Sequence, residues 1–380
     1  MKPRVLQVIP ALSGSGGPER GTVDLAVMLK KQGYENIVVS NGGYRVEELE
    51  RNGITHIKLP VHSKNPFIIR KNAKALEKII REHQINIVHA RSRAPAYSAK
   101  SAAKKTGAVF ITTFHGQYGL GPLGIKKLYN EVMAEGKIII APSEFIKKHI
   151  MKEYKVPEKR IRVILRGIDL VQFDPAKVHF ERVTALFKKW SLKEDETVIM
   201  LPGRLSPMKG ADLLIDALKD VKTKKKLRCL LVGDSNGKDD FVSELNRKIR
   251  KYKLESVVQL TGNCTDMPAA LMNADIVVIP SIYPEAFGRL TIEAQAMGRV
   301  VIASGHGGSK EIIKPGENGF LFPPGDIPTL KFYLEKVLNM PENERKKIMA
   351  EAIKSVRRNY STEKMCKETI SVYEEVLSNE

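Results

Sequence analysis

Two glutamates, Glu285 and Glu293, stand in the C-terminal half of the chain with seven residues between them. Glu285 falls in a Pro- and Gly-containing turn, and Glu293 lies one turn inside a helix expected over Arg289–Met297, which Gly298 ends. The N–H groups at the helix start belong to Phe287, Gly288, Arg289 and Leu290. Backbone donors and the helix dipole favour a pyrophosphate there, and the two carboxylates could accept ribose and sugar hydroxyls. The alternative is that both glutamates only complement the dipole.

Two basic residues follow a strand expected over Thr197–Leu201. Arg204 offers a planar fork of donors and Lys209 a compact charge near a helix start, so together they could hold two bridging phosphates. Ligands of open parallel sheets bind beyond the carboxyl ends of the strands, which is where these residues stand. The alternative is that both are solvated loop residues.

A glycine-rich turn over 13–20 follows the first expected strand, Val5–Ile9, and precedes a helix. Gly16 and Gly17 would let backbone amides approach an anion at the helix N-terminus. The turn lacks the Gly-Lys-Ser/Thr of a Walker loop, and Glu19 stands where the last glycine of a dinucleotide-binding turn belongs. A phosphate cradle and a flexible turn before Pro18 both remain open.

His115 and Arg91 also follow expected strands, Val109–Thr113 and Ile85–His89. Their position at the carboxyl ends favours a role in ligand binding. The alternatives are a structural histidine and a surface arginine.

The elements that position these residues alternate between apolar strands and helical patterns, which predicts βαβ units and parallel sheets. The first series is Val5–Ile9, Asn36–Val39, Ile85–His89, Val109–Thr113, Ile138–Ala141 and Val163–Leu165, with helices such as 19–31 and 68–82 between strands. The second series is Thr197–Leu201, Arg228–Val232, Val257–Thr261, Ile276–Pro280, Val300–Ala303 and Gly319–Phe322. We expect two α/β domains in tandem, a hinge within 167–193, and two terminal helices over 342–377, the last returning to the first domain.

Composition excludes several classes of protein. The 380 residues suit two domains, and 42% apolar with 28% charged residues argues against disorder or a fibre. No segment approaches the roughly 20 apolar residues of a spanning helix, and the N-terminus lacks the pattern of a secretory signal. Three cysteines, Cys229, Cys264 and Cys366, lack paired metal or redox spacing, which favours a reducing cytoplasm.

The net charge of +20 is concentrated in the first half of the chain. Residues 1–180 carry 31 Lys and Arg against 15 Asp and Glu, whereas residues 181–380 carry 32 against 28. This asymmetry predicts an anionic partner: nucleic acid, an anionic membrane face or a phosphorylated substrate. A solvated basic surface without a partner is the alternative.

The paired glutamates within Pro-Glu-Ala-Phe-Gly resemble the signature of retaining family 4 glycosyltransferases of the GT-B fold. Further motifs occur in the family's order over nearly the whole chain: 16–20 with Leu25 and Ala26, Ile87–Ser92, Thr113–Gly116, Pro142–Phe145, Arg166–Leu170 with Phe173, Gly203–Arg204 with Lys209–Gly210, Val232–Asp234 and Asn318–Pro323. The resemblance implies two Rossmann-like domains facing a cleft: 1–175 with the helix at about 360–380 for the acceptor, and 190–355 for the donor.

The resemblance also implies residue roles. Glu293 would hold the ribose diol, Arg204 and Lys209 the pyrophosphate, and Glu285 the transferred hexose. The turn at Gly16 and Gly17 would close on the distal phosphate, His115 would lie near the anomeric carbon, and Arg91 could face the acceptor or phosphates. Arg289 departs from the small or apolar residue that the family often has there.

The implied activity is retaining transfer of a hexosyl unit from a UDP- or GDP-sugar to a glycan or lipid-linked acceptor, in cell-envelope or lipopolysaccharide biosynthesis. The sequence has no Asp-X-Asp and no clustered His or Cys ligands, so we expect no metal and no cofactor besides the donor. Basic, apolar segments such as 67–81 and 125–129 suggest that this cytoplasmic protein touches the inner membrane face. The alternative, favoured for 67–81, is an ordinary helix packed on the sheet. Alternatives are a sugar-nucleotide epimerase and, more distantly, a nucleic-acid-binding protein.

Overall fold

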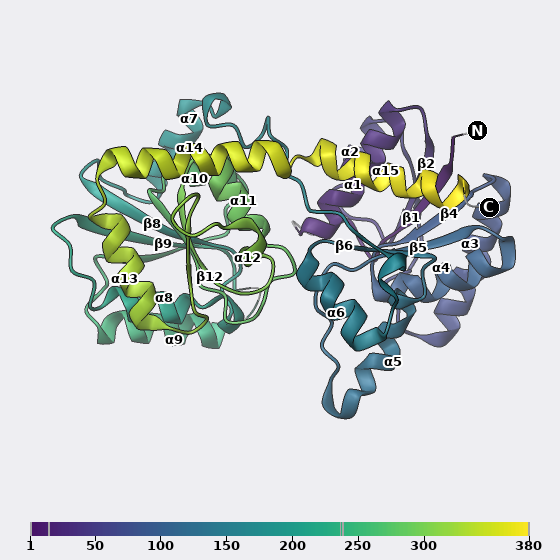
Figure 1. The fold of residues 1–380 in the computed structure, drawn as a ribbon, viewed down its shortest axis with the longest axis horizontal. Coiled ribbons are helices and arrows are strands. Elements are labelled where there is room, and N and C mark those ends of the chain that lie inside the picture. Colours follow the sequence, from purple (N-terminus) through teal and green to yellow (C-terminus); the bar gives the residue numbers. More distant parts are fainter. Residues whose placement is uncertain (1, 14–15, 236, 238, 379–380) are drawn as a thin grey trace. The chain divides into compact units, whose positions relative to one another are not determined.

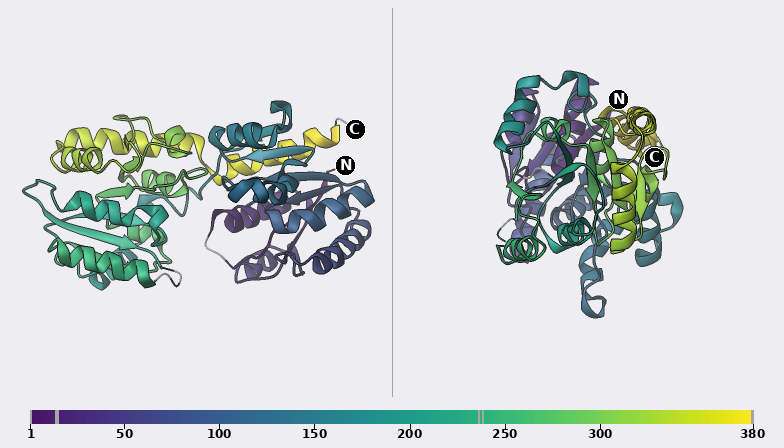
Figure 2. Two further views of the ribbon diagram at one scale, coloured as in Figure 1. Left: turned by 90° about the horizontal axis from the view of Figure 1, so that it is seen from below. Right: turned by 90° about the vertical axis from the view of Figure 1, so that its left-hand side faces the viewer.

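The computed structural model describes residues 2–13, 16–235, 237 and 239–378. Its contacts divide the chain into two compact units, one of residues 1–167 with 362–380 and one of residues 168–361. Each unit has a parallel sheet with helices on both faces (Figures 1 and 2). Among the described residues, no helix combines the length and apolar character that crossing a bilayer requires.

The sheet of the first unit has the strand order β3-β2-β1-β4-β5-β6-β7. Its strands are β1 (Arg4–Val8), β2 (Glu35–Ser40), β3 (Thr55–Lys58), β4 (Ile87–Ala90), β5 (Val109–Thr113), β6 (Ile138–Ala141) and β7 (Ile161–Val163). Val5 of β1 pairs with both Asn36 of β2 and Ile87 of β4. Strand order therefore reverses direction between β1 and β4, which makes that point the expected ligand crevice of a doubly wound sheet.

The sheet of the second unit has the order β10-β9-β8-β11-β12-β13, the same winding with its reversal between β8 and β11. Its strands are β8 (Glu196–Pro202), β9 (Lys226–Val232), β10 (Val258–Gly262), β11 (Ile276–Ile279), β12 (Val300–Ser304) and β13 (Phe320–Phe322). Central strands such as β11 and β12 are buried along their length and rich in Val and Ile, as strands covered on both faces must be.

Helices connect the strands and cover both sheets. They are α1 (Gly17–Lys31), α2 (Val46–Arg51), α3 (Pro66–Glu82), α4 (Arg93–Thr106), α5 (Ile125–Glu131), α6 (Glu144–Tyr154), α7 (Phe180–Lys189), α8 (Ala211–Leu218), α9 (Asp239–Lys251), α10 (Met267–Met272), α11 (Arg289–Ala296), α12 (Ser309–Ile312), α13 (Ile327–Leu338), α14 (Glu342–Asn359) and α15 (Thr362–Ser378). Short 3₁₀ turns lie at Pro122–Gly124, Val132–Ala134, Glu158–Arg160, Pro175–Lys177 and Pro207–Lys209.

The last helix, α15, completes the core of the first unit, as the apolar pattern of the C-terminal residues predicts. It lies beside α1 (Figure 1) and buries Met365, Ile370 and Tyr373 among residues of the sheet and of α1. Full burial of each such side chain stabilises by about 1.5–3 kcal/mol. The hydroxyl of Tyr373 lies 2.6 Å from His89 Nδ1, so this buried contact ties α15 to β4.

The sequence predictions fail mainly at the sheet edges. β3 was not predicted, and β7 ends at Val163, where the expected strand begins. Both lie at an edge of the sheet, where a short strand pairs on one side only and β3 alternates Thr, His, Ile and Lys without an apolar run. The segment proposed as a hinge, 167–193, contains a helix, α7.

Candidate active site

In the second unit, the loop after β8 and the loop after β11 pack backbone against backbone at the reversal of strand order. A Cβ on Gly210 would lie only 2.0 Å from the carbonyl oxygen of Pro280, so no side chain fits between the two loops. The N–H of Ile282 donates to the carbonyl of Met208 at 2.9 Å and joins them. This contact brings Lys209 and the first residues after β11 into one place.

Glu285 is held by two donors from these loops. Lys209 Nζ lies 2.5 Å from Glu285 Oε1, and the hydroxyl of Ser281 donates to the same oxygen at 2.7 Å. The side chains of Lys209 and Glu285 are 25% and 16% exposed, so the pair is partly desolvated yet reachable. The structure therefore joins the predicted phosphate-binding lysine directly to the predicted sugar-binding carboxylate.

A third loop, Ser304–Gly308 after β12, packs against the backbone of Glu285. This loop was not predicted from the sequence to be part of the site. A Cβ on Gly307 would lie 2.3 Å from the carbonyl oxygen of Glu285, and the N–H of Gly308 donates to that oxygen at 2.9 Å. His306 Nε2 lies 2.8 Å from the carbonyl oxygen of Ser281. The signal available was the Gly-His-Gly-Gly run over 305–308, directly after a buried strand, because glycines allow close backbone approach.

Glu293 lies inside α11 and is only 6% exposed. Burial raises the pKa of its carboxyl, and the guanidinium of Arg289, whose Nε lies 2.7 Å from Glu293 Oε1, opposes that rise. Arg289 therefore stabilises the ionised form of the Glu293 carboxylate, whose charge would otherwise be costly to bury.

The N-terminus of α11 forms the opening next to Glu293. Gly288, at a φ of 105°, is the N-cap of α11, and Thr291 and Ile292 donate to its carbonyl at 3.0 and 3.4 Å. The preceding N–H groups, from Phe287 to Leu290, thus lie at the positive end of the helix. Phe287 is buried against the ring of Tyr360, and Leu290 packs at Gly203. Arg204 is exposed on the loop after β8.

In the first unit, the described part of the glycine-rich turn caps α1. Gly16 is the N-cap and Gly17 the first helical residue, with the N–H of Arg20 donating to the Gly16 carbonyl at 3.2 Å. A Cβ on Gly16 would lie 2.6 Å from Glu19 Oε2, so the glutamate lies directly against the turn. Gly14 and Ser15 of the predicted cradle lie outside the described residues.

His115 follows β5 and contacts a residue that was not predicted for the site, Arg166, which follows β7. An Nη of Arg166 donates to His115 Nδ1, which assigns the remaining ring proton to Nε2. His115 Nε2 is buried, and a backbone contact with Arg91 favours the protonated ring without outweighing the other effects. Burial, Arg166 and Arg91, in that order, hold the pKa of His115 well below its ordinary value, so the ring is a neutral donor.

Arg91 follows β4 and is 3% exposed, so its interpretation as a surface arginine is wrong. Its Nη1 donates to the side-chain oxygen of Gln7 at 3.1 Å, inside the unit. Burial lowers its pKa from the ordinary arginine value. Arg166 could have been found by the same criterion as Arg91, since each is a basic residue directly beyond a strand.

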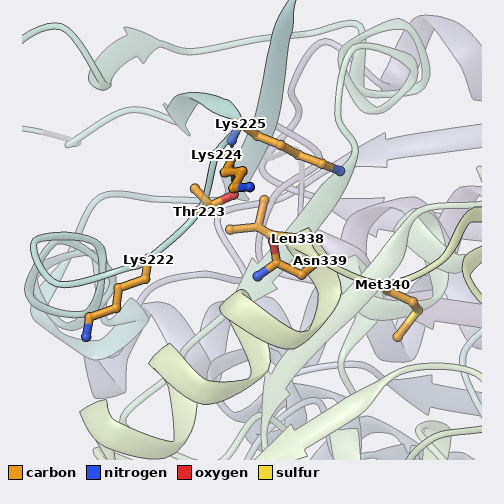
Figure 3. A pocket seen from close by; sticks show the side chains of 7 residues that line it. All are labelled: Lys222, Thr223, Lys224, Lys225, Leu338, Asn339 and Met340. Carbon is orange, nitrogen blue, oxygen red and sulfur yellow. Dashed lines mark hydrogen bonds between the residues drawn. The ribbon is translucent and has the colours of Figure 1, made fainter.

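The predicted residues thus gather at two sheet edges. The carboxyl edge of the first sheet carries Gly16, Gly17, Arg91 and His115. The other predicted site residues lie at the carboxyl edge of the second sheet. Figure 3 shows an open pocket elsewhere in the second unit, lined by Lys222, Thr223, Lys224, Lys225, Leu338, Asn339 and Met340. It contains none of the predicted residues, and its lysines precede β9 at the opposite edge of the sheet.

Known proteins match this arrangement. Residues 15–172 match the model for Glycosyltransferase Family 4, and residues 183–355 match that for Glycosyl transferases group 1. A solved glycosyltransferase from Rickettsia africae is 38% identical with a TM-score of 0.92, covering 100% of both chains. An Anabaena protein solved with UDP-glucose, Alr3699/HepE, has a TM-score of 0.82 at 21% identity, over 99% of this chain and 100% of that one.

Curated relatives align over a smaller part of their length. The lipopolysaccharide 1,2-N-acetylglucosaminetransferase of Salmonella typhimurium is 28% identical over 63% of this chain and 62% of its own. The chain spans between 53% and 59% of the length of the first curated relatives it matches. The two matching family models, and the likeness over the full length of the Rickettsia enzyme, place the chain among the family 4 glycosyltransferases of the GT-B fold.

Proposed function

We propose that this glycosyltransferase transfers a hexosyl unit, with retention of configuration, from a nucleotide diphosphate sugar to a glycan or lipid-linked acceptor. The observation that carries the proposal is the grouping of Glu285, Lys209, Glu293 and the N-terminus of α11 at one reversal of strand order. That grouping supplies acceptors for hydroxyls next to donors for phosphates. The Anabaena neighbour solved with UDP-glucose supports the donor class.

The second unit is the donor-binding part in this proposal. Glu293 accepts the ribose hydroxyls, because it is an anchored carboxylate just inside the helix whose positive end favours the pyrophosphate. Glu285 accepts hydroxyls of the hexose. Arg204 and Lys209 bind the phosphates, and Lys209 can exchange part of its contact with Glu285 for the incoming anion. Arg289 positions Glu293.

The reaction needs stabilisation of charge on the leaving group. As the bond between the anomeric carbon and the distal phosphate oxygen breaks, negative charge grows on that phosphate, and the acceptor hydroxyl forms the new bond from the same face. Its proton passes to the departing phosphate. Two charge-assisted donors of about 1.5–3 kcal/mol each, if felt mainly in the transition state, would accelerate this step by about a hundredfold or more. These cations would replace a metal ion.

His115 and the turn at Gly16 and Gly17 are the contributions of the first unit. With Nδ1 occupied by Arg166, His115 presents an N–H and no basic lone pair, so it hydrogen-bonds sugar or acceptor oxygens and does not remove a proton. The glycine turn binds the distal phosphate. Arg91 acts from the interior, because its side chain is almost fully buried.

The biological setting that we propose is cell-envelope or lipopolysaccharide biosynthesis in the cytoplasm. The Salmonella relative is named for lipopolysaccharide synthesis, which supports this setting. Cys229, Cys264 and Cys366 are free thiols, as a reducing compartment would leave them. An epimerase is not favoured, because both family models and the Rickettsia protein are described as glycosyltransferases.

The first unit also carries a candidate membrane surface. The apolar stripe of α3, including Leu76 and Ile79, is buried in the unit and is not available to lipid. Phe67 at its start is 84% exposed, and Ile125 and Leu128 of α5 are 67% and 72% exposed. Lys64 lies 5.8 Å from the ring of Tyr129, which places the start of α3 beside α5. Apolar side chains among lysines suit an anionic phospholipid surface.

Glu293→Gln tests the ribose contact. Loss of a charge-assisted bond should weaken binding of the UDP- or GDP-sugar by about 10- to 150-fold in calorimetry. Because the pKa of Glu293 is raised, acidification should begin to weaken donor binding by the unaltered protein at a higher pH than it would for an ordinary glutamate. The variant should not show this pH-dependent loss of affinity. Glu317→Gln, at an exposed ion pair with Lys314, is the matched control. Unchanged affinity in Glu293→Gln would overturn the assignment.

Arg166→Met tests the state of His115. Removing a cation that lowers the pKa of the imidazole should move that pKa up toward 6.5, read from the imidazole ¹⁵N shifts. Turnover should then decline as the pH falls through the new pKa, whereas the unaltered enzyme should show no such step near 6.5. Arg51→Met, at an exposed pair with Glu47, serves as control. An imidazole pKa unaffected by Arg166→Met would contradict the proposed contact between Arg166 and His115.

Product analysis tests the reaction itself. With a nucleotide sugar and an acceptor extract, NMR of the early product should show the donor's anomeric configuration, and turnover should persist in EDTA. An inverted anomer would disprove retention, and loss of turnover in EDTA would disprove metal independence. Conversion of the sugar without any acceptor would instead favour the epimerase.

Vesicle sedimentation tests the membrane surface. The protein should sediment with vesicles rich in phosphatidylglycerol at low salt and much less with phosphatidylcholine, because the attraction is partly electrostatic. The triple variant Phe67→Ser, Ile125→Ser, Leu128→Ser should lose sedimentation, and Val171→Ser, Phe180→Ser, Phe332→Ser, at exposed positions of the second unit, should keep it. Equal sedimentation of both variants would exclude this surface.

A further inference from the structure

Three of the four residues in the run 305–308 are glycines, and each lies against neighbouring backbone. The N–H of Gly305 donates to a carbonyl of β13 at 2.7 Å. A Cβ on Gly307 or Gly308 would lie 2.3 or 2.0 Å from a carbonyl oxygen of the loop after β11. The fourth residue, His306, is therefore held by backbone contacts on both sides, and its imidazole is the side chain that this run presents to the neighbouring loop.

The imidazole of His306 supports the backbone of Ser281. Nε2 lies 2.8 Å from the carbonyl oxygen of Ser281, and a carbonyl oxygen only accepts, so Nε2 is the nitrogen that carries the proton. The other ring nitrogen, Nδ1, is buried without a hydrogen-bond partner in the described part of the chain. Because Nδ1 is closed to solvent, a ligand does not contact it, and His306 acts on the site through Ser281.

Ser281 passes this support on to Glu285. Its side chain is 3% exposed, and its hydroxyl donates to Glu285 Oε1 at 2.7 Å. Two hydrogen bonds in series thus join the loop after β12 to the carboxylate: His306 holds the carbonyl of Ser281, and the hydroxyl of Ser281 holds Glu285. The direction of that hydroxyl depends on the position of its own backbone, which His306 fixes.

This support matters more once a donor is bound. Lys209 contacts the same carboxylate oxygen as Ser281. In the proposed function, on which this inference rests, Lys209 gives part of that contact to the incoming phosphates. The hydroxyl of Ser281 then carries more of the task of orienting Glu285 toward the sugar.

We propose that His306 is a positioning residue that determines the affinity for the hexose part of the donor. It holds Ser281, Ser281 orients Glu285, and Glu285 accepts the hexose hydroxyls. The nucleoside diphosphate part contacts other residues, so its binding does not depend on His306. The effect of His306 is therefore specific for the sugar and is absent when the sugar is absent.

Calorimetry with and without the sugar measures this effect. A panel of UDP- and GDP-hexoses identifies the nucleotide sugar that the unaltered protein binds most tightly, and the matching UDP or GDP is the comparison ligand. His306→Leu, which is similar in size and has no donor, should weaken binding of the nucleotide sugar by about fivefold, as expected for one neutral hydrogen bond. Its affinity for UDP or GDP alone should be unchanged, which also shows that the variant is folded.

Rescue and coupling distinguish positioning from a loss of packing. His306→Gln has a side-chain N–H that can donate to the same carbonyl, so it should restore most of the lost affinity. Adding His306→Leu to Ser281→Ala should cause no further loss, because His306 acts through the hydroxyl that Ser281→Ala removes. His179→Leu, at an exposed histidine of the same unit, is the matched control and should bind as the unaltered protein does.

Glu285→Gln separates failure of this inference from failure of the proposed function. Undiminished affinity of Glu285→Gln for the nucleotide sugar, or no binding of any member of the panel by the unaltered protein, would overturn the proposed hexose contact and the role of His306 with it. If Glu285→Gln weakens binding and His306→Leu does not, the role of His306 alone is wrong. It is also wrong if His306→Leu weakens UDP or GDP as much as the nucleotide sugar, or if His306→Gln gives no rescue.

Discussion

Close approach of backbone to backbone controls the geometry of the second unit's carboxyl edge. Gly210 meets the carbonyl of Pro280, Gly307 meets that of Glu285, and Gly308 meets that of Phe287, each at a distance that excludes a Cβ. Three loops that follow different strands are thereby held as one layer. These contacts hold the loops that carry Lys209 and Glu285 next to each other. They therefore fix the geometry of the partly buried ion pair between the two side chains.

The same edge separates two carboxylates into different environments. Glu285 is partly exposed and shares its oxygen with Lys209 and Ser281, so an incoming hydroxyl or phosphate can compete for these partners. Glu293 is buried inside α11, and its ion pair with Arg289 offsets the cost of its charge. One carboxylate is therefore suited to exchange contacts with a ligand, while the other is an anchored acceptor at a helix N-terminus.

In the first unit, basic residues beyond the strands control the charge state of two histidines. Basic residues beyond β4 and β7 point into the unit, where their fields keep His89 and His115 neutral. A neutral imidazole with Nδ1 occupied is a donor at physiological pH, which suits recognition of oxygens better than proton removal. The C-terminal helix α15 closes this region, so residues distant in sequence, such as His89 and Tyr373, share one buried hydrogen bond. The helix α15 is therefore part of the core of the first unit.

Much of this molecule could be predicted from local pattern. Apolar runs at regular spacing predicted the central strands of both sheets. The loops that follow these strands led us to predict Lys209, Glu285 and Glu293 as site residues, because the carboxyl ends of parallel strands share an edge. The missed β3 and the displaced β7 are edge strands, whose pairing on one side leaves a weak apolar signal.

Tertiary structure alone decided the partners. Arg91 and Arg166 follow different strands and are 75 residues apart in sequence (166 − 91), and the strand order brings both guanidinium groups to Gly21. The pairing of Arg289 with Glu293, the support of Glu285 by Gly307, and the burial of Arg91 likewise depend on distances between elements. Local sequence determines which elements form and what stands at their ends, whereas the charge state of a side chain depends on burial and neighbours that only packing assembles.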